Sequence, residues 1–171
     1  MIYKRIDNAN DPDIPYLIEI LKLPEISRFL SIDEHNYWTY VARTENVFYF
    51  KVFENDVLVA ATHLEILNET MYMAVMVIPM YQRKGIATKI IKDIQSGNIP
   101  FDFGKIEVSI DKSNTASIKL FEKMNFKFVS AENELLNYAW QKIWLIKTRE
   151  FKSIKRMLIA SCKTAKENAK W

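Results

Sequence analysis

The sequence is poor in the residues that build disulfides and metal sites. Its 171 residues include one cysteine, Cys162, and two histidines, His35 and His63. A single cysteine forms no internal disulfide, and two histidines this far apart lack the spacing of zinc ligands. Neither histidine has a serine or cysteine partner in a pattern typical of nucleophilic catalysis. The sequence therefore predicts no metal site, and a lone cysteine fits a reducing compartment such as the cytoplasm.

Glycine and long apolar runs are also scarce. Only Gly85, Gly97 and Gly104 are present, so a glycine in a loop that approaches a ligand stands out. The longest apolar stretch, residues 71–80, is too short to cross a bilayer and contains Pro79. Residues 1–16 carry five charged side chains and no apolar run, unlike a secretory signal. We therefore expect a soluble cytoplasmic protein without a membrane partner.

Length and composition favour one globular domain. Hydrophobic residues make up 49% and charged residues 26% of the chain, the balance of an ordinary folded protein. A chain of 171 residues is expected to fold around one buried core. We assign residues 1–146 to this domain and residues 147–171 to a basic amphipathic helix appended to it.

Charge is distributed unevenly along the chain. Residues 142–171 hold nine basic and two acidic residues, whereas residues 1–141 hold fifteen basic and nineteen acidic ones. The mildly acidic body suits a cationic amine substrate. The basic tail fits water, an anionic lipid surface or nucleic acid, and we favour water because no aromatic residues interleave with its lysines for base stacking. Its apolar stripe fits either the domain itself or a second copy in a homodimer.

The order of predicted elements indicates a mixed α/β fold. Helical spacing and capping residues predict helices near residues 11–22, 32–43, 86–95, 114–124 and 148–170, with Pro24 ending the first. Alternating side chains and turn residues predict strands at residues 1–6, 47–53, 57–67, 71–78, 105–110, 126–130 and 135–145. The 71–78 strand is apolar on both faces, which is typical of a central strand covered on both sides. The strand, helix, strand order from residue 71 to residue 110 predicts a parallel pair.

A short basic loop joins the 71–78 strand to the next helix. It reads Gln82-Arg83-Lys84-Gly85-Ile86-Ala87-Thr88. The first amides of a helix have no intrahelical acceptor and the helix dipole adds positive charge there, so this junction suits a phosphate. Gly85 permits close backbone approach, and Arg83 and Lys84 add positive charge. Ala87 keeps the helix start open, and Thr88 can donate its hydroxyl. Gly85 also fits a plain turn, because the Gln-x-x-Gly-x-Ala spacing is short.

Two motifs resemble signatures of the GNAT superfamily of N-acetyltransferases. Residues 82–87 match its coenzyme-A-binding pattern of Gln or Arg, two residues, Gly, one residue, then Gly or Ala, and residues 74–79 resemble the strand before it. Residues 114–126 are similar to its second signature, Asn-x-x-Ser followed by Leu-Tyr-Glu-Lys-x-Gly-Phe. The resemblance is specific over residues 71–128. In addition, residues 24–30 with Tyr37 and Trp38 resemble the branch that acetylates ribosomal-protein N-termini.

The resemblance implies a fold, a cosubstrate and a set of binding residues. The fold would be a three-layer sandwich with a mixed, mostly antiparallel sheet, a central splayed parallel strand pair and helices on both faces. The cosubstrate would be acetyl-CoA, with no metal. Its pantetheine arm would pair with Met76, Val77 and Ile78. Its pyrophosphate would lie on the amides of Gln82, Arg83, Lys84, Gly85, Ile86, Ala87 and Thr88. Asn114 and Ser117 would contact the pantetheine or phosphate portion.

The usual general acid of the superfamily has no counterpart in the second signature. Its tyrosine is matched by Phe121, which has no proton to give. We take Tyr138 as the first substitute and Tyr72 as the second, with core or rim packing as the other role for Tyr138. A general base must take a proton from the substrate ammonium. Glu65 is the base we select, and the residues left open beside it are Glu69, Glu107 and His63.

The sequence supports two functions. The first is transfer of an acetyl group from acetyl-CoA to a primary amine by direct attack in a ternary complex. The amine would belong to a small molecule, a polyamine or a peptide N-terminus. The alternative is a regulatory module that binds an acyl-CoA without turning it over, which Phe121 motivates.

Overall fold

The computed structural model describes residues 1–32 and 36–142. This part of the chain contains both strands and helices. The elements, in chain order, are β1 (Ile2–Arg5), α1 (Ile14–Lys22), α2 (Pro24–Ser27), α3 (Tyr37–Arg43), β2 (Val47–Glu54), β3 (Val57–Leu67), β4 (Thr70–Val77), the 3-10 helix η1 (Pro79–Tyr81), α4 (Ile86–Gln95), β5 (Lys105–Asp111), α5 (Thr115–Lys123), β6 (Lys127–Glu132) and β7 (Leu135–Gln141). The predicted helix at 148–170, the 147–171 segment and the end of the last predicted strand lie outside the described residues.

Most predicted elements are present, but the predictions for the N-terminal half missed one short helix and placed the start of another too early. All seven predicted strands are found, and the helix predicted at residues 86–95 coincides with α4. Pro24 was expected only to end a helix, but it also begins α2, because the fixed φ of proline suits the first helical position. The helix predicted from residue 32 begins at Tyr37 instead. Asn36 precedes it with a non-helical backbone, at φ −130°.

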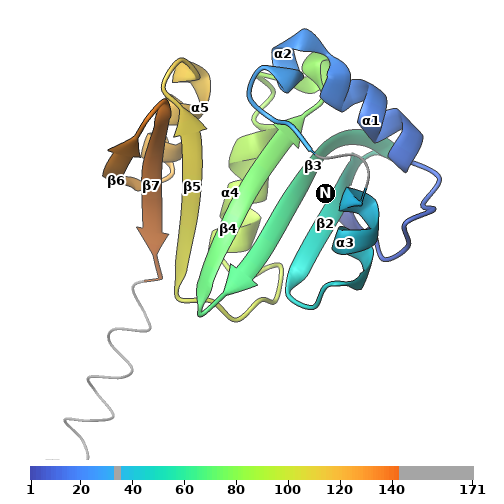
Figure 1. Ribbon diagram of the computed structural model, residues 1–171, viewed down its shortest axis with the longest axis horizontal. Helices are drawn as coiled ribbons and strands as arrows, with labels where there is room; N and C mark the ends of the chain where they lie inside the picture. The colour runs from blue at the N-terminus through green and yellow to red at the C-terminus, as the bar shows by residue number, and fades with distance from the viewer. Residues whose placement is uncertain (33–35, 143–171) are drawn as a thin grey trace, which may run out of the picture. The chain divides into compact units, whose positions relative to one another are not determined.

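The seven strands form one sheet in the order β1-β2-β3-β4-β5-β7-β6 (Figure 1). Antiparallel pairing joins β1 to β2, β2 to β3, β3 to β4 and β6 to β7, whereas β4 and β5 are parallel. The chain between β4 and β5 contains α4, as a crossover between parallel strands requires. The prediction of a mixed, mostly antiparallel sheet with a central parallel pair is confirmed.

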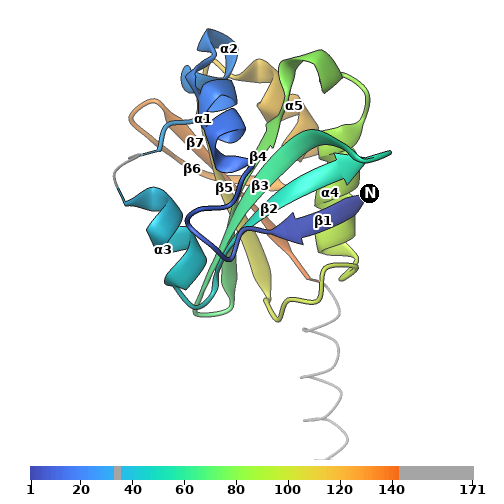
Figure 2. The same ribbon diagram turned by 90° about the vertical axis from the view of Figure 1, so that its right-hand side faces the viewer.

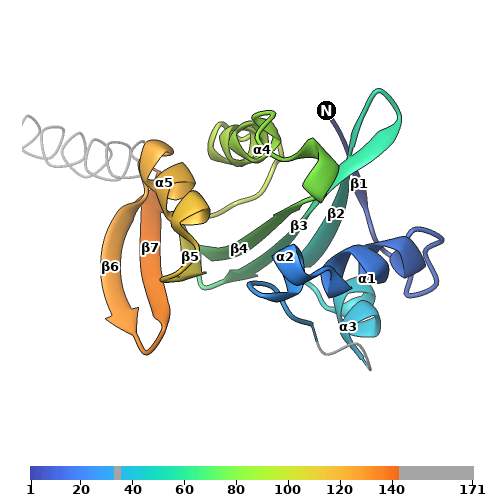
Figure 3. The ribbon, with the colours of Figure 1, turned by 90° about the horizontal axis from the view of Figure 1, so that it is seen from above.

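Helices cover both faces of this sheet. Seen from above, α4 and α5 lie on one side of the strands and α1, α2 and α3 on the other (Figure 3). Figure 2 shows the same separation, with α1 and α3 to the left of the sheet and α4 to the right. We call the two surfaces of the sheet the α4 face and the α1 face. The predicted three-layer sandwich is confirmed.

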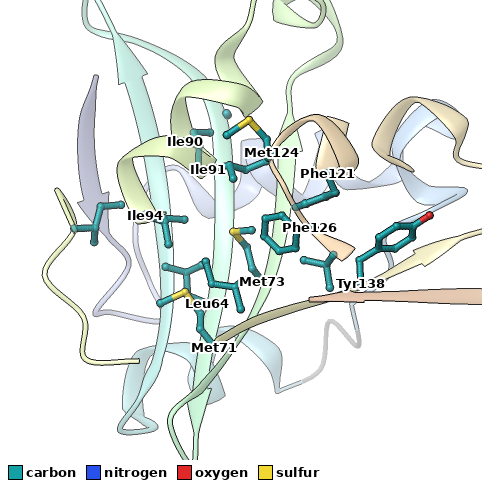
Figure 4. Packing of buried hydrophobic residues seen from close by; sticks show 14 of the residues in the cluster. Leu64, Met71, Met73, Ile90, Ile91, Ile94, Phe121, Met124, Phe126 and Tyr138 are labelled. Carbon is teal, nitrogen blue, oxygen red and sulfur yellow. The ribbon is translucent and has the colours of Figure 1, made fainter. Parts of the chain in front are cut away.

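Each face of the sheet has its own hydrophobic core. On the α4 face, Ile90 and Ile94 of α4 are fully buried in a cluster with Met73 of β4 (Figure 4). On the α1 face, Leu17 of α1 is fully buried in a second cluster, which contains Met76 of β4. β4 therefore contributes side chains to both cores, as its two apolar faces predict.

Two-residue turns fix the register of β2, β3 and β4. Asn55 and Asp56 connect β2 to β3, and Asn68 and Glu69 connect β3 to β4. All four residues have positive φ, between 48° and 65°. Two consecutive residues of this kind form the hairpin turn whose twist matches that of the paired strands. A β-bulge then shifts the β2–β3 register by one residue between Val52 and Phe53, whereas the β3–β4 register runs unbroken from its turn. Because register decides which face each side chain occupies, the turns and the bulge together decide which side chains meet on the α1 face.

A buried ion cluster joins the segment before α1 to the sheet. The Lys51 ammonium on β2 lies 2.7 Å from an Asp11 oxygen and 2.6 Å from an Asp13 oxygen, and Lys51 is 6% exposed. Burial lowers the pKa of Lys51, but the two carboxylates together outweigh burial and raise it. The cluster therefore holds the start of α1 against the α1 face.

Replacing Lys51 by methionine should destabilise the protein. Methionine keeps much of the side-chain length but leaves two neighbouring carboxylates without their cation. Since Asp13 is partly exposed and regains water, we expect a loss near or below the lower end of the about 3–5 kcal/mol that breaking a buried pair costs. The control is Lys89→Met, whose exposed pair with Glu54 contributes about 0.5 kcal/mol or less. Urea unfolding compares the two, and equal midpoints would contradict the role of the cluster.

Candidate functional site

β4 and β5 pair over only three residues and then separate. The pairing starts at Thr70 and Lys105 and ends at Tyr72 and Glu107. β4 remains paired with β3 as far as Val77, whereas β5 lies beside β7 on its other edge. Figure 1 shows the two strands diverging toward their C-terminal ends. The predicted splayed parallel pair is confirmed.

The separation leaves part of the β4 backbone without a strand partner. In an antiparallel pair, successive residues direct their peptide groups alternately toward and away from the neighbouring strand. The Ile78 N–H donates to a β3 carbonyl at 3.0 Å, so Ile78 and, by alternation, Met76 face β3. Val75 and Val77 therefore direct their peptide groups to the side from which β5 has separated. The Val77 carbonyl there accepts a hydrogen bond from the Gln82 side chain at 3.2 Å.

The chain leaves β4 through a turn whose backbone is left-handed at two positions. Arg83 has a φ of 60° and Gly85 a φ of 81°, and α4 begins at Ile86. The Lys89 amide donates to the Gly85 carbonyl at 3.0 Å, which is the first hydrogen bond of the helix. The three amides before Lys89 have no acceptor within the helix and suit an anion. A Cβ built at Gly85 meets no atom within 4 Å, so the left-handed backbone is what favours glycine here.

Positive side chains border this turn. Of the residues predicted to hold the pyrophosphate, Gln82, Arg83, Lys84 and Gly85 are exposed, Ala87 and Thr88 are partly buried, and Ile86 is buried. Ile86 belongs to the core of the α4 face, so it anchors the turn. The Lys84 ammonium lies 5.2 Å from the centre of the Tyr81 ring. The turn therefore offers free amides and two cationic side chains to solvent, an arrangement that fits a phosphate.

Asn114 and Ser117 lie together at the start of α5. The Asn114 side chain accepts a hydrogen bond from the Ser117 amide at 3.1 Å, which caps the helix. Just before α5, the Ser113 hydroxyl donates to Asp111 at 2.6 Å, and the Ser113 hydrogen bonds lower the pKa of Asp111. Arg28, at the end of α2, lies 3.5 Å from the Ser113 hydroxyl. α2 therefore contacts the loop that precedes Asn114.

Phe121, at the usual position of the general acid, and Tyr138, its first substitute, both belong to the α4-face core (Figure 4). Phe121 is buried, and its ring centre lies 5.0 Å from that of Phe126. Tyr138 on β7 is also buried, and its hydroxyl donates to Glu122 of α5 at 3.1 Å. Burial, and then the hydrogen bond and charge of Glu122, raise the pKa of Tyr138. The Tyr138 hydroxyl is therefore already bonded to a carboxylate.

Three polar side chains form a row across the α1 face. The register pairs Glu65 of β3 with Tyr72 of β4, and Tyr72 with Glu107 of β5. Side chains of paired residues point to the same face, so the two glutamates flank the tyrosine. Tyr72 is 44% exposed, and the Lys105 ammonium lies 2.6 Å from the Glu107 carboxylate. This row contains the last residue pair before β4 and β5 separate.

His63 lies beside Glu65 on the same face of β3. Its Nδ1 atom is 2.6 Å from the Tyr37 hydroxyl oxygen, and its Nε2 atom is 4.0 Å from a Glu65 oxygen. Burial lowers the pKa of His63 more than the Glu65 charge raises it, so the ring is neutral at pH 7. Burial raises the pKa of Tyr37, which therefore keeps its proton and can donate it to Nδ1. Nε2 then carries the ring proton and faces Glu65.

Most of the base candidates meet on the α1 face. Glu65 lies next to His63 and in one row with Glu107, whereas Glu69 lies in the turn between β3 and β4. Tyr40 of α3 was not predicted to belong to the site. Burial raises the pKa of Tyr40 and the Glu65 charge adds to this, so the Tyr40 hydroxyl lies near Glu65. The sequence gives little sign of this role, because Tyr40 differs from an ordinary surface tyrosine only in lying near Glu65 of β3.

The splayed strand pair, the basic turn at the start of α4 and the capped start of α5 together match the arrangement that the resemblance to N-acetyltransferases implies. The model of the acetyltransferase (GNAT) family matches residues 14–126, which is more than half of the chain. The protein therefore belongs to the GNAT family of acetyltransferases.

Solved structures share this fold at low sequence identity. The N-acetyltransferase PseH from Campylobacter jejuni, in complex with acetyl coenzyme A, has a TM-score of 0.66 at 14% identity, over 82% of this chain and 98% of that one. Spermidine N-acetyltransferase from Vibrio cholerae, with CoA and spermine, has a TM-score of 0.68 at 13% identity, over 82% and 95%. A domain from Methanocaldococcus jannaschii has a TM-score of 0.64 at 20% identity, over 82% and 97%. No match was found among curated protein sequences.

Within residues 1–32 and 36–142, no three or more His, Cys, Asp or Glu side chains are grouped so that they could hold a metal ion. No helix in the same part of the chain combines the length and the apolar character needed to cross a bilayer.

Acidification should destabilise the protein through His63. The unfolded chain takes up a proton at the ordinary histidine pKa of 6.5, whereas the folded protein, with its lowered pKa, resists protonation. Stability is therefore complete above about pH 6.5 and falls as the pH drops below that value toward the folded pKa. His63→Gln removes the titration and should flatten this dependence. Urea midpoints at about pH 7.5 and pH 5.5 test it; an equal fall in both proteins would show that other groups are responsible.

Proposed function

We propose that the protein transfers an acetyl group from acetyl-CoA to a primary amine in a ternary complex. The observation that carries this proposal is the end of β4–β5 pairing at Tyr72, with unpaired β4 peptide groups beyond it and free α4 amides at the end of the strand. An amide-containing chain such as pantetheine can pair with a free strand edge as an added strand does. A diphosphate suits a helix N-terminus. Both features occur in one continuous stretch, residues 73–88.

The coenzyme would occupy this stretch from strand to helix. Val75 offers both of its peptide groups, and Val77 offers its N–H and, once the Gln82 side chain is displaced, its carbonyl. Met76 and Ile78 would hold the strand in place through β3 and the α1-face core. The pyrophosphate would lie on the amides of residues 83–88, beside the exposed side chains of Arg83 and Lys84, because the Gln82 amide, also predicted to bind it, donates to the Pro79 carbonyl at 3.1 Å. The predicted contacts from α5 would come from Asn114 and Ser117.

The reaction removes protons from nitrogen and returns one to sulfur. A base takes one proton from the substrate ammonium, and the amine nitrogen then attacks the thioester carbonyl carbon. The N–C bond forms, the C–S bond breaks, and the nitrogen loses its second proton as the thiolate gains one. The products are the N-acetyl amine, coenzyme A as its thiol and one proton released to solvent. Holding both reactants in one site accelerates the attack by making it effectively unimolecular.

Glu65 is the base in this proposal, directly or through a water molecule. Its side chain is 41% exposed, it is next to the neutral His63, and its row is the last before the strands separate. Tyr138 remains the proposed acid. Because its hydroxyl donates to Glu122, Tyr138 would reach the thiolate only after exchanging that hydrogen bond.

Similar structures favour an amine as the acceptor. The Vibrio cholerae protein is a spermidine N-acetyltransferase solved with CoA and spermine, and the Campylobacter jejuni protein is an N-acetyltransferase solved with acetyl coenzyme A. Both transfer to nitrogen. The acidic character of residues 1–141 and the exposed Glu65 agree with a cationic acceptor.

A non-catalytic acyl-CoA-binding module is the second candidate, and the burial of Phe121 favours it. A phenylalanine packed on Phe126 cannot donate a proton to a leaving thiolate. Acetyl transfer across a panel of amines, measured beside a coenzyme titration, separates the two functions. Coenzyme binding without any turnover would favour the module.

Gly85→Ala should weaken coenzyme A binding. Alanine in the left-handed backbone costs about 1–2 kcal/mol, and relieving that strain moves the amides of the turn. Gly97→Ala is a matched control, because Gly97 has a φ of 77° and also meets no atom within 4 Å of a built Cβ. Both variants should lose similar stability in urea. Only Gly85→Ala should raise the Kd for coenzyme A, by about ten-fold or 1.4 kcal/mol, in isothermal titration. An equal effect of both variants on Kd would contradict the proposed phosphate site.

A further inference from the structure

A carboxylate between two exposed tyrosines lies next to the point where β4 and β5 separate. Glu65 has Tyr72 of β4 as its paired neighbour on one side. α3 packs on β2, which lies on the other side of β3, and Tyr40 of α3 is near the Glu65 carboxylate. The two tyrosines are 44% and 40% exposed. We call Glu65, Tyr72 and Tyr40 the tyrosine-glutamate site.

The charge of Glu65 is not neutralised within the described residues. Glu107, the other carboxylate of the row, forms an ion pair with Lys105 at 2.6 Å. The basic side chain beside Glu65 is His63, with Nε2 at 4.0 Å, and burial keeps this ring neutral at pH 7. In residues 1–32 and 36–142, no lysine or arginine forms an ion pair with Glu65. The site therefore presents one uncompensated negative charge to solvent.

The next residue along β4 on the α1 face is small. Ala74 pairs with His63 and follows Tyr72 toward the separation of the strands. A methyl group is the smallest side chain apart from that of glycine, so this position adds little bulk beside the tyrosine-glutamate site. Ala74 directly precedes Val75, the residue with unpaired peptide groups on β4.

We propose that the tyrosine-glutamate site binds the ammonium group of an aliphatic amine, which is the acceptor of the acetyl group. The Glu65 carboxylate would supply charge and hydrogen bonds, and the two tyrosine rings would supply cation–π attraction. Amines that carry a carboxylate of their own are disfavoured, because the unpaired charge of Glu65 repels it. This inference rests on the proposed function and names the substrate class of that site.

Three amines with four-carbon chains test the charge preference. They are butylamine with one positive charge, 1,4-diaminobutane with two, and 4-aminobutyrate, which is a zwitterion. We expect kcat/KM for the first two to exceed that for 4-aminobutyrate by about ten-fold or more, because a like charge near Glu65 opposes binding. The assays use the full chain with acetyl-CoA at a fixed ionic strength and follow release of the coenzyme thiol.

Variants test the residues of the site with the amine that is the best substrate. Tyr72→Leu and Tyr40→Leu keep apolar bulk but remove the ring, and each should raise KM about two- to five-fold with kcat nearly unchanged. Glu65→Gln should raise KM about ten-fold or more and also lower kcat, since it removes both the charge and the base. Tyr16→Leu on α1, where the tyrosine is 47% exposed, is the control and should change neither value.

The outcomes separate this inference from the proposed function. Efficient acetylation of 4-aminobutyrate, or an unchanged KM in both tyrosine variants, would overturn the inference while acetyl transfer stands. Preferential acetylation of a peptide N-terminus over all three amines would do the same. A protein that fails to bind coenzyme A in titration, or that binds it and acetylates nothing, would overturn both. Urea midpoints of the variants show whether a change in KM reflects unfolding.

Discussion

The early end of pairing between β4 and β5 is the constraint on which the rest of the structure depends. β4 is paired with β3 along its whole length, starting from the turn at Asn68 and Glu69. β5 instead lies beside β7, and next to these strands the Lys112 amide donates to the Glu134 carbonyl at 2.9 Å. Each strand therefore follows a different neighbour, and the twist of paired strands carries the two halves of the sheet apart. The unpaired peptide groups would be a liability in an ordinary sheet, but in the function that we propose they would pair with a ligand that carries its own amides.

The alternation of side chains on β4 connects the two halves of the candidate site. Met71 and Met73 enter the α4-face core, in which Ile86 anchors the turn that offers its amides to a phosphate. The residue between them, Tyr72, points to the opposite face and lies beside Glu65. A slip of one residue in the register would exchange these faces, placing the tyrosine in the core and a methionine beside the carboxylate. The same register thus places both the proposed coenzyme site and the proposed acceptor site.

Local features of the site could be predicted from the sequence, whereas features that depend on register could not. Gly85 at a strand-to-helix turn and Asn114 as a helix cap are each determined by a few neighbouring residues, and the sequence signals for them are correspondingly clear. The meeting of Glu65, Tyr72 and Glu107 depends on the pairing of three strands that are far apart in the chain. The sequence showed all three residues as candidates for catalysis, but not that they form one row.

The same distinction explains the short helix α2, which was not predicted, the start of α3, which was predicted too early, and the position of the proposed acid. A proline after a helix ends that helix, but its fixed φ also suits the first turn of a new one, and only the packing of Ile26 into the α1-face core decides that α2 forms. Asn36 interrupts the helical pattern through its own backbone conformation. For Tyr138, the strand was predicted correctly, but the hydrogen bond to Glu122 depends on how α5 packs against β7.

Phe121 cannot act as a general acid, and the sizes of the possible contributions to catalysis show how much this weakens the case for an enzyme. A thiol has a pKa near 8.5, so the coenzyme thiolate is a stable leaving group near neutral pH and needs little protonation as it departs. An alkyl ammonium has a pKa near that of lysine, about 10.4, so the amine must lose a proton before it can attack. General acid or base catalysis typically contributes about 10²- to 10⁴-fold, whereas orientation reaches effective molarities of about 10⁵–10⁸ M. A GNAT fold without the usual tyrosine therefore keeps the larger contribution, and the proton transfer that matters more is the one at the amine, on the side of the sheet where Glu65 lies.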